Sequence, residues 1–143
     1  MFSIKPVMKT NVITAKKNTP VYDAIELLLK NNITGLPIAD DDNNLVGMIT
    51  EKDVLKLLYA NIKEDAKVEQ FMTKDVVTFD ESDNLTDVAE CFIRNNFRRV
   101  PILKNGKIVG ILSKKDIIAH ILKIKKVGHL EMALQSHLAS IRK

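Results

Sequence analysis

The chain has 143 residues, of which 45% are hydrophobic and 28% charged, and its formal net charge is +4 at pH 7. This length fits one compact domain, or two very small domains that share a core, and it allows a stable apolar core without disulfides. The single cysteine excludes an internal disulfide framework, and no apolar run approaches the roughly 20 residues of a membrane span, so we expect a cytoplasmic protein outside the membrane.

The positive charge is concentrated at the C-terminal end. Residues 1–113 contain 15 Lys and Arg against 16 Asp and Glu, a balance of −1, whereas residues 114–143 contain 7 against 2, a balance of +5. Such a segment can bind an acidic partner or nucleic acid, or it can be the solvated, Lys-rich face of a helix. We favour the solvated helix and do not expect nucleic acid as a partner.

The first half of the chain predicts the order strand, helix, strand, strand, helix. A short strand is expected at residues 12–14. Thr19 and Pro20 should begin a helix, as its N-cap and its first helical residue, and Asn31 and Asn32 should end it. Two strands at 36–39 and 45–49, joined by a turn-rich loop at 40–44, precede a second helix at 51–59.

The second half repeats the first. Residues 7–14, 30–38 and 45–53 match residues 71–78, 94–102 and 108–116, with an offset of 64 that becomes 63 after the loop at 40–44. Three matched blocks in one register indicate a tandem repeat. The second copy therefore predicts elements at 76–79, 84–95, 100–103, 108–112 and 114–124.

The repeats suggest a division of the chain into a first repeat at 1–60, a linker at 61–70, a second repeat at 71–124 and a helical extension at 125–143. The two repeats should pack sheet to sheet about a pseudo-twofold axis, which leaves two equivalent clefts. The extension should pack back on the pair or contact a partner chain, because its apolar residues have helical spacing. These residues are Val127, Leu130, Ala133, Leu134, Leu138 and Ile141.

The most informative motif occurs once in each repeat, where a strand runs into a helix. Residues 47–53 and 110–116 both read Gly, two apolar residues, Thr or Ser, two polar residues and Asp. The glycine permits another group to approach the backbone closely, the helix start suits a phosphate, and the Asp can accept two hydrogen bonds from a ribose. The hydroxyl and the Asp can also form a capping box, and the two roles are compatible.

Residues 7–124 resemble the CBS-domain family, named for cystathionine beta-synthase, in the tandem arrangement called a Bateman module. The marks of the resemblance are the strands around Pro37 and Pro101, each followed by the Gly-x-x-Thr/Ser-x-x-Asp motif. The resemblance implies an α+β fold and a regulatory module that is not an enzyme and has no catalytic site. It also implies an adenine nucleotide as ligand (AMP before ADP or ATP), a homodimer formed through the helices, and an unidentified protein partner.

The resemblance further implies which residues contact the nucleotide. Asp53 and Asp116 would hold the ribose diol, with Thr50 and Ser113 near the ribose or phosphate. Backbone contacts to adenine would come from Ile13, Thr14, Val77 and Thr78. The apolar residues that sandwich the ring would be Leu36, Pro37, Val100 and Pro101.

The two repeats differ where a phosphate would lie. Members such as the gamma subunit of AMP-activated protein kinase carry a basic residue two positions before the Pro. The second repeat has Arg99 there, with Arg98 beside it, whereas the first repeat has Gly35 and Thr34. We therefore expect the second cleft to bind a phosphate through Arg99.

Other chemistries have less support. S-adenosylmethionine shares the adenosine half of the nucleotide and is the alternative ligand, against which Arg99 argues. A nucleic-acid-binding protein that uses the basic segment at 114–126 is the other alternative, and its binding would weaken steeply with salt. The loop at 40–44 resembles a calcium loop, but Leu45 stands where Gly is needed, and the histidines lack metal-binding spacing, so no metal is expected. Cys91 is expected in the core.

Overall fold

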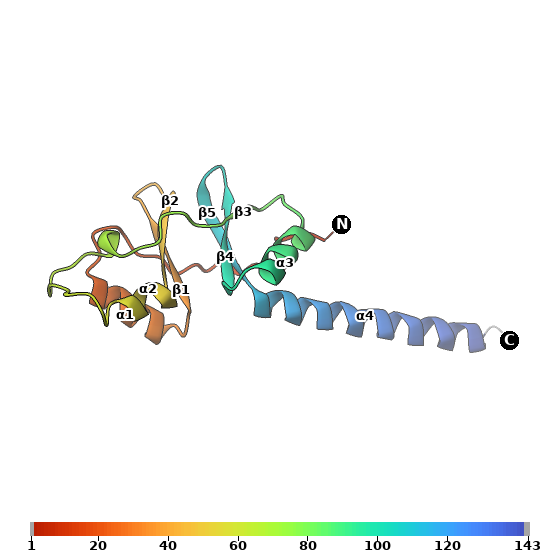
Figure 1. The fold of residues 1–143 in the computed structure, drawn as a ribbon. Coiled ribbons are helices and arrows are strands. Elements are labelled where there is room, and N and C mark those ends of the chain that lie inside the picture. Colours follow the sequence, from red (N-terminus) through yellow and green to blue (C-terminus); the bar gives the residue numbers. More distant parts are fainter. Residues whose placement is uncertain (1, 142–143) are drawn as a thin grey trace.

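The computed structural model describes residues 2–141, apart from the side chains of residues 129–131 and 133. Two small sheets lie beside each other in the centre, and the helices lie to their outer sides (Figure 1). The first repeat forms α1 (Val21–Lys30), β1 (Gly35–Ala39), β2 (Leu45–Thr50) and α2 (Glu51–Lys56). After a short 3-10 helix, η1 (Val68–Gln70), the second repeat forms β3 (Phe79–Asp80), α3 (Leu85–Arg94), β4 (Arg99–Lys104), β5 (Lys107–Ser113) and α4 (Lys114–Ile141). The predicted α+β fold with a C-terminal helix is confirmed.

The two hairpins have the same register. Gly35 pairs with Thr50, and Arg99 pairs with Ser113, so the residues two positions before each Pro face the start of the motif helix. Both hairpins also contain a register shift directly after an isoleucine, Ile38 or Ile102. The repeat seen in the sequence is therefore a repeat in the backbone.

The tips of the two hairpins contact each other. Asn44 forms an isolated antiparallel bridge with Lys107. Asn43 Nδ2 donates to the Ile108 carbonyl at 3.0 Å, and Lys107 Nζ donates to the Asp42 carbonyl at 2.7 Å. These hydrogen bonds join the halves at one end of the interface between the sheets.

The first strand of each repeat was predicted wrongly in position. Residues 12–14 form no strand, and Ala15 alone makes a parallel bridge, to Ile38. In the second repeat, pairing begins at Phe79, which lies opposite Ile102. The reason is that the residues before each pairing point run past a cavity between the repeats, where no strand lies alongside them.

The predicted N-cap of α1 was also wrong. The helix begins at Val21, and Thr19 Oγ1 accepts a hydrogen bond from the Lys16 N–H at 3.0 Å instead of capping it. The Val21 N–H donates to the Ala66 carbonyl at 2.9 Å. The Ala66 carbonyl thus accepts a hydrogen bond from a helix-start N–H that a side-chain cap would otherwise accept.

The helices that follow the two motifs differ in length. Helix α2 ends at Lys56, three residues before its predicted end, whereas α4 continues without a break to Ile141 and projects from the body (Figure 1). The predicted separate helix at 125–143 is therefore the continuation of α4. Of the two arrangements expected for this segment, packing back on the repeats is not observed, since its described apolar side chains are exposed; the side chains of Leu130 and Ala133 lie outside the description. The exposed residues are Val127, Leu134, Leu138 and Ile141.

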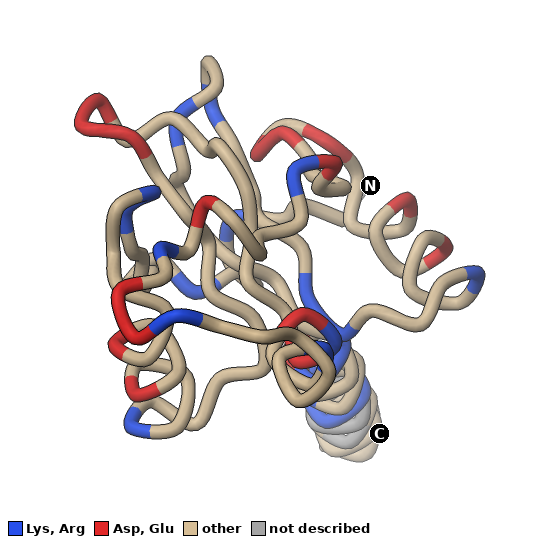
Figure 2. Tube along the Cα trace, turned by 60° about the vertical axis from the view of Figure 1, so that its left-hand side comes forward, with Lys and Arg blue, Asp and Glu red and all other residues tan. Residues whose placement is uncertain are grey.

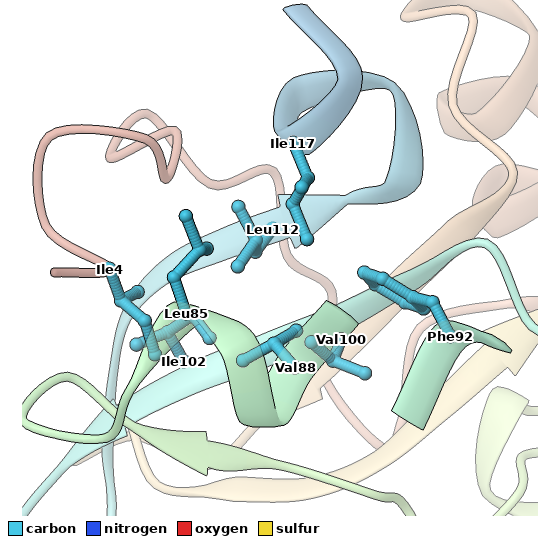
Figure 3. Close-up of a cluster of buried hydrophobic side chains, with 8 residues drawn as sticks. All are labelled: Ile4, Leu85, Val88, Phe92, Val100, Ile102, Leu112 and Ile117. Carbon is cyan, nitrogen blue, oxygen red and sulfur yellow. The ribbon is translucent and has the colours of Figure 1, made fainter. Parts of the chain in front are cut away.

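The core of each half includes the first residues of the other sequence repeat. We call residues 4–9 and 68–73 the leading segments of the first and second repeat. Ile4 is fully buried in a cluster with residues of α3, β4, β5 and α4 (Figure 3). Val68 and Met72 are buried in the equivalent cluster of the first half, around α1, β1 and β2. Isolated bridges of Lys9 to Ile111 and of Thr73 to Met48 continue these contacts. The two halves therefore exchange their first segments.

The motif glycines make room for these exchanged segments. A Cβ on Gly47 would lie 2.6 Å from Met72 Sδ and 3.0 Å from the Thr73 carbonyl oxygen. A Cβ on Gly110 would lie 2.5 Å from Met8 Sδ. The expected close approach to the backbone is confirmed, and the approaching group is the chain itself.

We predict that Gly47→Ala destabilises the fold by about 1–3 kcal/mol, because the added methyl overpacks the contact with Met72. Gly128→Ala is the matched control: a Cβ there has no neighbour within 4 Å, and alanine favours the helix. Thermal and urea unfolding of the three proteins measure the effect. Equal stability of the Gly47→Ala and wild-type proteins would contradict the packing role of this glycine.

Candidate functional site

Two cavities lie between the repeats, and each is built from both of them. The cavity of about 670 Å³ contains residues 50–53 of the first motif, residues 75–77 and residues 95–99, and we call it the Asp53 cavity. The cavity of about 800 Å³ contains residues 113–116 of the second motif, residues 11–13 and residues 31–35, and we call it the Asp116 cavity. Each motif therefore faces the segment that precedes the first pairing of the opposite repeat.

The structure brings together most of the predicted site residues, but not all of them. Those that line the Asp53 cavity are Thr50, Asp53, Val77 and Arg99. Those that line the Asp116 cavity are Ile13, Pro37, Arg99, Ser113 and Asp116. Leu36 and Val100 are buried in the two core clusters, and the Pro101 side chain is also buried. Thr14 and Thr78 are partly exposed and are not among the residues that line either cavity.

Asp53 is held by hydrogen bonds from three directions. Its Oδ2 accepts from the Thr50 N–H at 2.9 Å, from Thr50 Oγ1 at 2.9 Å and from Thr73 Oγ1 at 2.9 Å. The Asp53 N–H donates in return to Thr50 Oγ1 at 3.2 Å, which completes a capping box with Asp in place of the usual Glu. Only 9% of Asp53 is exposed. Its carboxylate is therefore both a helix cap and a link between the repeats.

Asp116 forms the same cap but keeps one oxygen available. Its Oδ2 accepts from the Ser113 N–H at 3.1 Å, and its own N–H donates to Ser113 Oγ at 3.0 Å. Oδ1 has an ion pair with Lys9 Nζ at 3.8 Å, and the Lys9 side chain is 72% exposed. An exposed ion pair at this distance is weak. Asp116 Oδ1 can therefore accept a hydrogen bond from a ligand hydroxyl.

Lys9 and Thr73 are functional candidates that the sequence analysis missed. They are equivalent residues, since each follows the methionine of a leading segment, and each contacts the Asp of the opposite motif. The signal was present in the aligned blocks around Met8 and Met72, where one repeat has Lys and the other Thr. What the alignment could not show is that each leading segment crosses to the other half.

Arg99 is the one predicted phosphate ligand, and it lines both cavities. Burial lowers the pKa of its guanidinium from the ordinary value, and the carboxylates of Asp116 and Glu51 oppose this shift. Its Nε is buried and has no hydrogen-bond partner among the described residues. A guanidinium remains charged despite such a shift, so Arg99 is a partly desolvated cation with a free donor.

The two cavities differ in charge. The Asp116 cavity has five basic residues and one acidic residue, a balance of +4, whereas the Asp53 cavity has four basic and three acidic residues, a balance of +1. Lys114 and Lys115 at the start of α4 contribute to this difference, and Figure 2 shows further basic residues along the helix that leads to the C-terminus. The basic residues of the Asp116 cavity are Lys9, Arg98, Arg99, Lys114 and Lys115. Its electrostatic character therefore suits an anion.

Two kinds of feature are absent from residues 2–141. No group of three His, Cys, Asp or Glu side chains is arranged to hold a metal ion. No helix in this part of the chain is long and apolar enough to cross a membrane.

The two repeats enclose two cavities, and each cavity is lined by the Thr or Ser and the Asp of one motif, which defines a tandem-repeat module. The model of the CBS domain matches the chain twice, at residues 4–60 and 68–123. The chain belongs to the CBS-domain family, as the sequence resemblance predicted.

Relatives and solved structures agree with this assignment. Protein MJ1225 of Methanocaldococcus jannaschii is 39% identical over 115 residues, which are 80% of this chain but only 41% of that protein. The crystal structure of CBSX2 in complex with AMP is 31% identical with a TM-score of 0.78, over 87% of this chain and 99% of that one. The CBS domain pair of protein MJ0100, in complex with 5′-methylthioadenosine and S-adenosyl-L-methionine, is 32% identical with a TM-score of 0.75, over 87% and 98% of the two chains. The same CBSX2 name belongs to a chloroplast protein of Arabidopsis thaliana that is 29% identical over 82% of this chain and 62% of its own length.

We predict that Thr73→Val destabilises the protein by about 1–3 kcal/mol, because it removes a hydrogen bond to a buried carboxylate. Thr10→Val is the control, since Thr10 is exposed and lies next to Lys9, the first-repeat equivalent of Thr73. Urea unfolding of both variants measures the difference. A Thr73→Val protein as stable as the control would show that the contact with Asp53 contributes nothing to stability.

Proposed function

We propose that the chain is a cytoplasmic regulatory module, not an enzyme, and that it binds an adenine nucleotide in the cavities between its repeats, with AMP preferred. The basic Asp116 cavity carries this proposal. It combines a carboxylate oxygen available for ribose hydroxyls, a helix start and five basic residues. A ligand with a ribose at one end and a phosphate at the other fits these groups.

The nucleotide would lie with its base toward the first repeat. Ile13 and Pro37 line the Asp116 cavity opposite the motif and would contact adenine, with Thr14 next to Ile13 in the same segment. Val77 would do the same in the Asp53 cavity, beside Thr78. Leu36, Val100 and Pro101 would act from the core, by holding the strands that form the cavity walls. The AMP complex of CBSX2, at 31% identity, supports this class of ligand.

S-adenosylmethionine is the second candidate ligand. The CBS domain pair of MJ0100, which is 32% identical, was crystallised with it and with 5′-methylthioadenosine. These molecules share adenosine with AMP but have no phosphate, so they could use Asp116 without using Arg99. The positive charge of the Asp116 cavity disfavours a cationic sulfonium and favours AMP.

A homodimer is the proposed assembly. Exposed apolar side chains occur in equivalent pairs on the helices and helix ends of the two repeats. The pairs are Leu29 and Ile93, Leu55 and Ile118, Leu58 and Ile121, and Tyr59 and Leu122. A surface with this internal twofold equivalence suits an isologous contact with a second copy. The exposed apolar residues of distal α4 could extend that contact or bind another protein.

We predict that Asp116→Ala weakens AMP binding ten- to a hundredfold, or about 1.5–3 kcal/mol, because charge-assisted hydrogen bonds to the ribose are lost. Calorimetry with AMP, ADP, ATP, adenosine and S-adenosylmethionine at matched salt measures this. Asp87→Ala removes the same charge at an exposed site outside both cavities and should leave affinity unchanged.

Asp116 also caps α4, so each variant is first checked by thermal unfolding. Asp116→Asn, which keeps an acceptor for the cap, replaces the alanine variant if that protein does not fold. Wild-type affinity in a folded Asp116 variant would remove the residue from the site. Absence of binding by every adenosyl ligand would overturn the proposed function.

We predict that the wild-type protein is a dimer at micromolar concentration and that Leu58→Glu with Ile121→Glu makes it a monomer, because buried charge opposes the apolar contact. Light scattering measures the mass. Thr10→Glu, an exposed position outside the apolar pairs, is the charge control. Leu134→Glu tests whether distal α4 adds to the interface. A monomeric wild-type protein, with and without nucleotide, would contradict the proposed assembly.

A further inference from the structure

Gly35 and Arg99 are equivalent positions that meet in the centre of the module. Gly35 pairs with Thr50 in the first hairpin, and Arg99 pairs with Ser113 in the second. Both residues line both cavities, which places them close to the pseudo-twofold axis. The centre therefore contains one arginine where two symmetric side chains could stand.

The side chain of Arg99 lies against Gly35. A Cβ added to Gly35 would be 2.5 Å from Met48 Cε, 3.4 Å from Arg99 Cδ and 3.7 Å from Arg99 Cγ. Because Gly35 has no side chain of its own, the Met48 methyl fills the position of its Cβ, and the aliphatic part of Arg99 packs beside it. From this central position Arg99 lines both cavities rather than one.

Acidic groups from opposite cavities act on this guanidinium. Asp116 belongs to one cavity and Glu51 to the other, and both favour the charged form of Arg99. Each of these carboxylates has another basic neighbour, since Asp116 pairs with Lys9 and Glu51 with Arg98, both at 3.8 Å. The buried Nε of Arg99 has no hydrogen-bond partner in the described part of the chain. Arg99 therefore retains donors for an anion from either side.

We propose that Arg99 is a single phosphate-binding group shared by the two cavities, so that an anionic adenosine ligand in one cavity weakens the binding of a second in the other. This inference rests on the proposed function. A guanidinium makes its strongest contact as a bidentate pair with one phosphate, and it cannot form that pair on both sides at once. An uncharged adenosine does not need Arg99, so two adenosine molecules bind independently.

The charge of the Asp53 cavity strengthens this coupling. Without Arg99 it has three basic residues, Lys52, Lys56 and Arg98, against the carboxylates of Glu51, Asp53 and Asp75. A phosphate that enters while Arg99 is engaged elsewhere would meet a cavity with no net positive charge. The Asp116 cavity without Arg99 still has four basic residues against one carboxylate, so it should fill first.

The test compares AMP with adenosine in the wild-type and Asp116→Ala proteins, and repeats the comparison in an Arg99→Ala background. Calorimetry gives the affinities, and methyl NMR assigns them, because Met48 lines the Asp53 cavity and Ile111 lines the Asp116 cavity. We expect the affinity of the Asp53 cavity for AMP to be at least about tenfold higher in the Asp116→Ala protein than in the wild-type protein with its Asp116 cavity filled. This is the usual size of the coupling between linked sites. Adenosine should show no such difference, and Arg99→Ala should abolish the difference for AMP.

Arg94→Ala is the matched control, because Arg94 is exposed, pairs with Glu90 and lies outside both cavities, and the difference should persist in that protein. Equal AMP affinity of the Asp53 cavity in the wild-type and Asp116→Ala proteins would overturn the sharing of Arg99 and leave the proposed function intact. The same conclusion would follow if AMP never perturbed Met48 in either protein. Absence of any response of both methyl groups to AMP and to adenosine would instead overturn the proposed function.

Discussion

The contact of each leading methionine with the motif glycine of the opposite repeat is the constraint on which the rest of the structure depends. Met72 lies on Gly47 and Met8 on Gly110, at separations that leave no room for a Cβ. These contacts accompany the exchange of core residues. Ile4 of the first repeat is buried in the core of the second half, and Val68 of the second repeat is buried in the core of the first half. A single repeat would lack part of its own core, so the two halves stabilise each other.

The same contact also connects the two halves at the functional motifs. The residue after each methionine reaches the Asp of the opposite motif, as Thr73 does at Asp53 and Lys9 does at Asp116. The residues of the proposed site and the residues that stabilise the fold therefore overlap in this chain. The Asp side chains cap their helices, and a ligand that competes for them would act on the interface between the repeats.

Duplication produced two cavities of similar construction and different chemistry. The backbone registers are the same, but replacements at equivalent positions, Lys9 for Thr73 and Lys114 for Glu51, give the two cavities different charges. One cavity has a firmly hydrogen-bonded carboxylate and nearly balanced charge, and the other has an available oxygen and a strong positive balance. Helix α4 begins within the Asp116 cavity and extends from the body.

The repeat, the hairpins and helices within it, the capping box and the position of Arg99 could be predicted from the sequence, because each depends on local spacing and residue type. It placed the first strands and the start of α1 wrongly, since the pairing of Ala15 with Ile38 and of the Val21 N–H with the Ala66 carbonyl depends on segments distant in sequence. The exchange of the leading segments and the position of Arg99 at both cavities are visible only in the tertiary structure. These properties depend on how the two copies face each other, and the local pattern of residue types within each copy does not encode that arrangement.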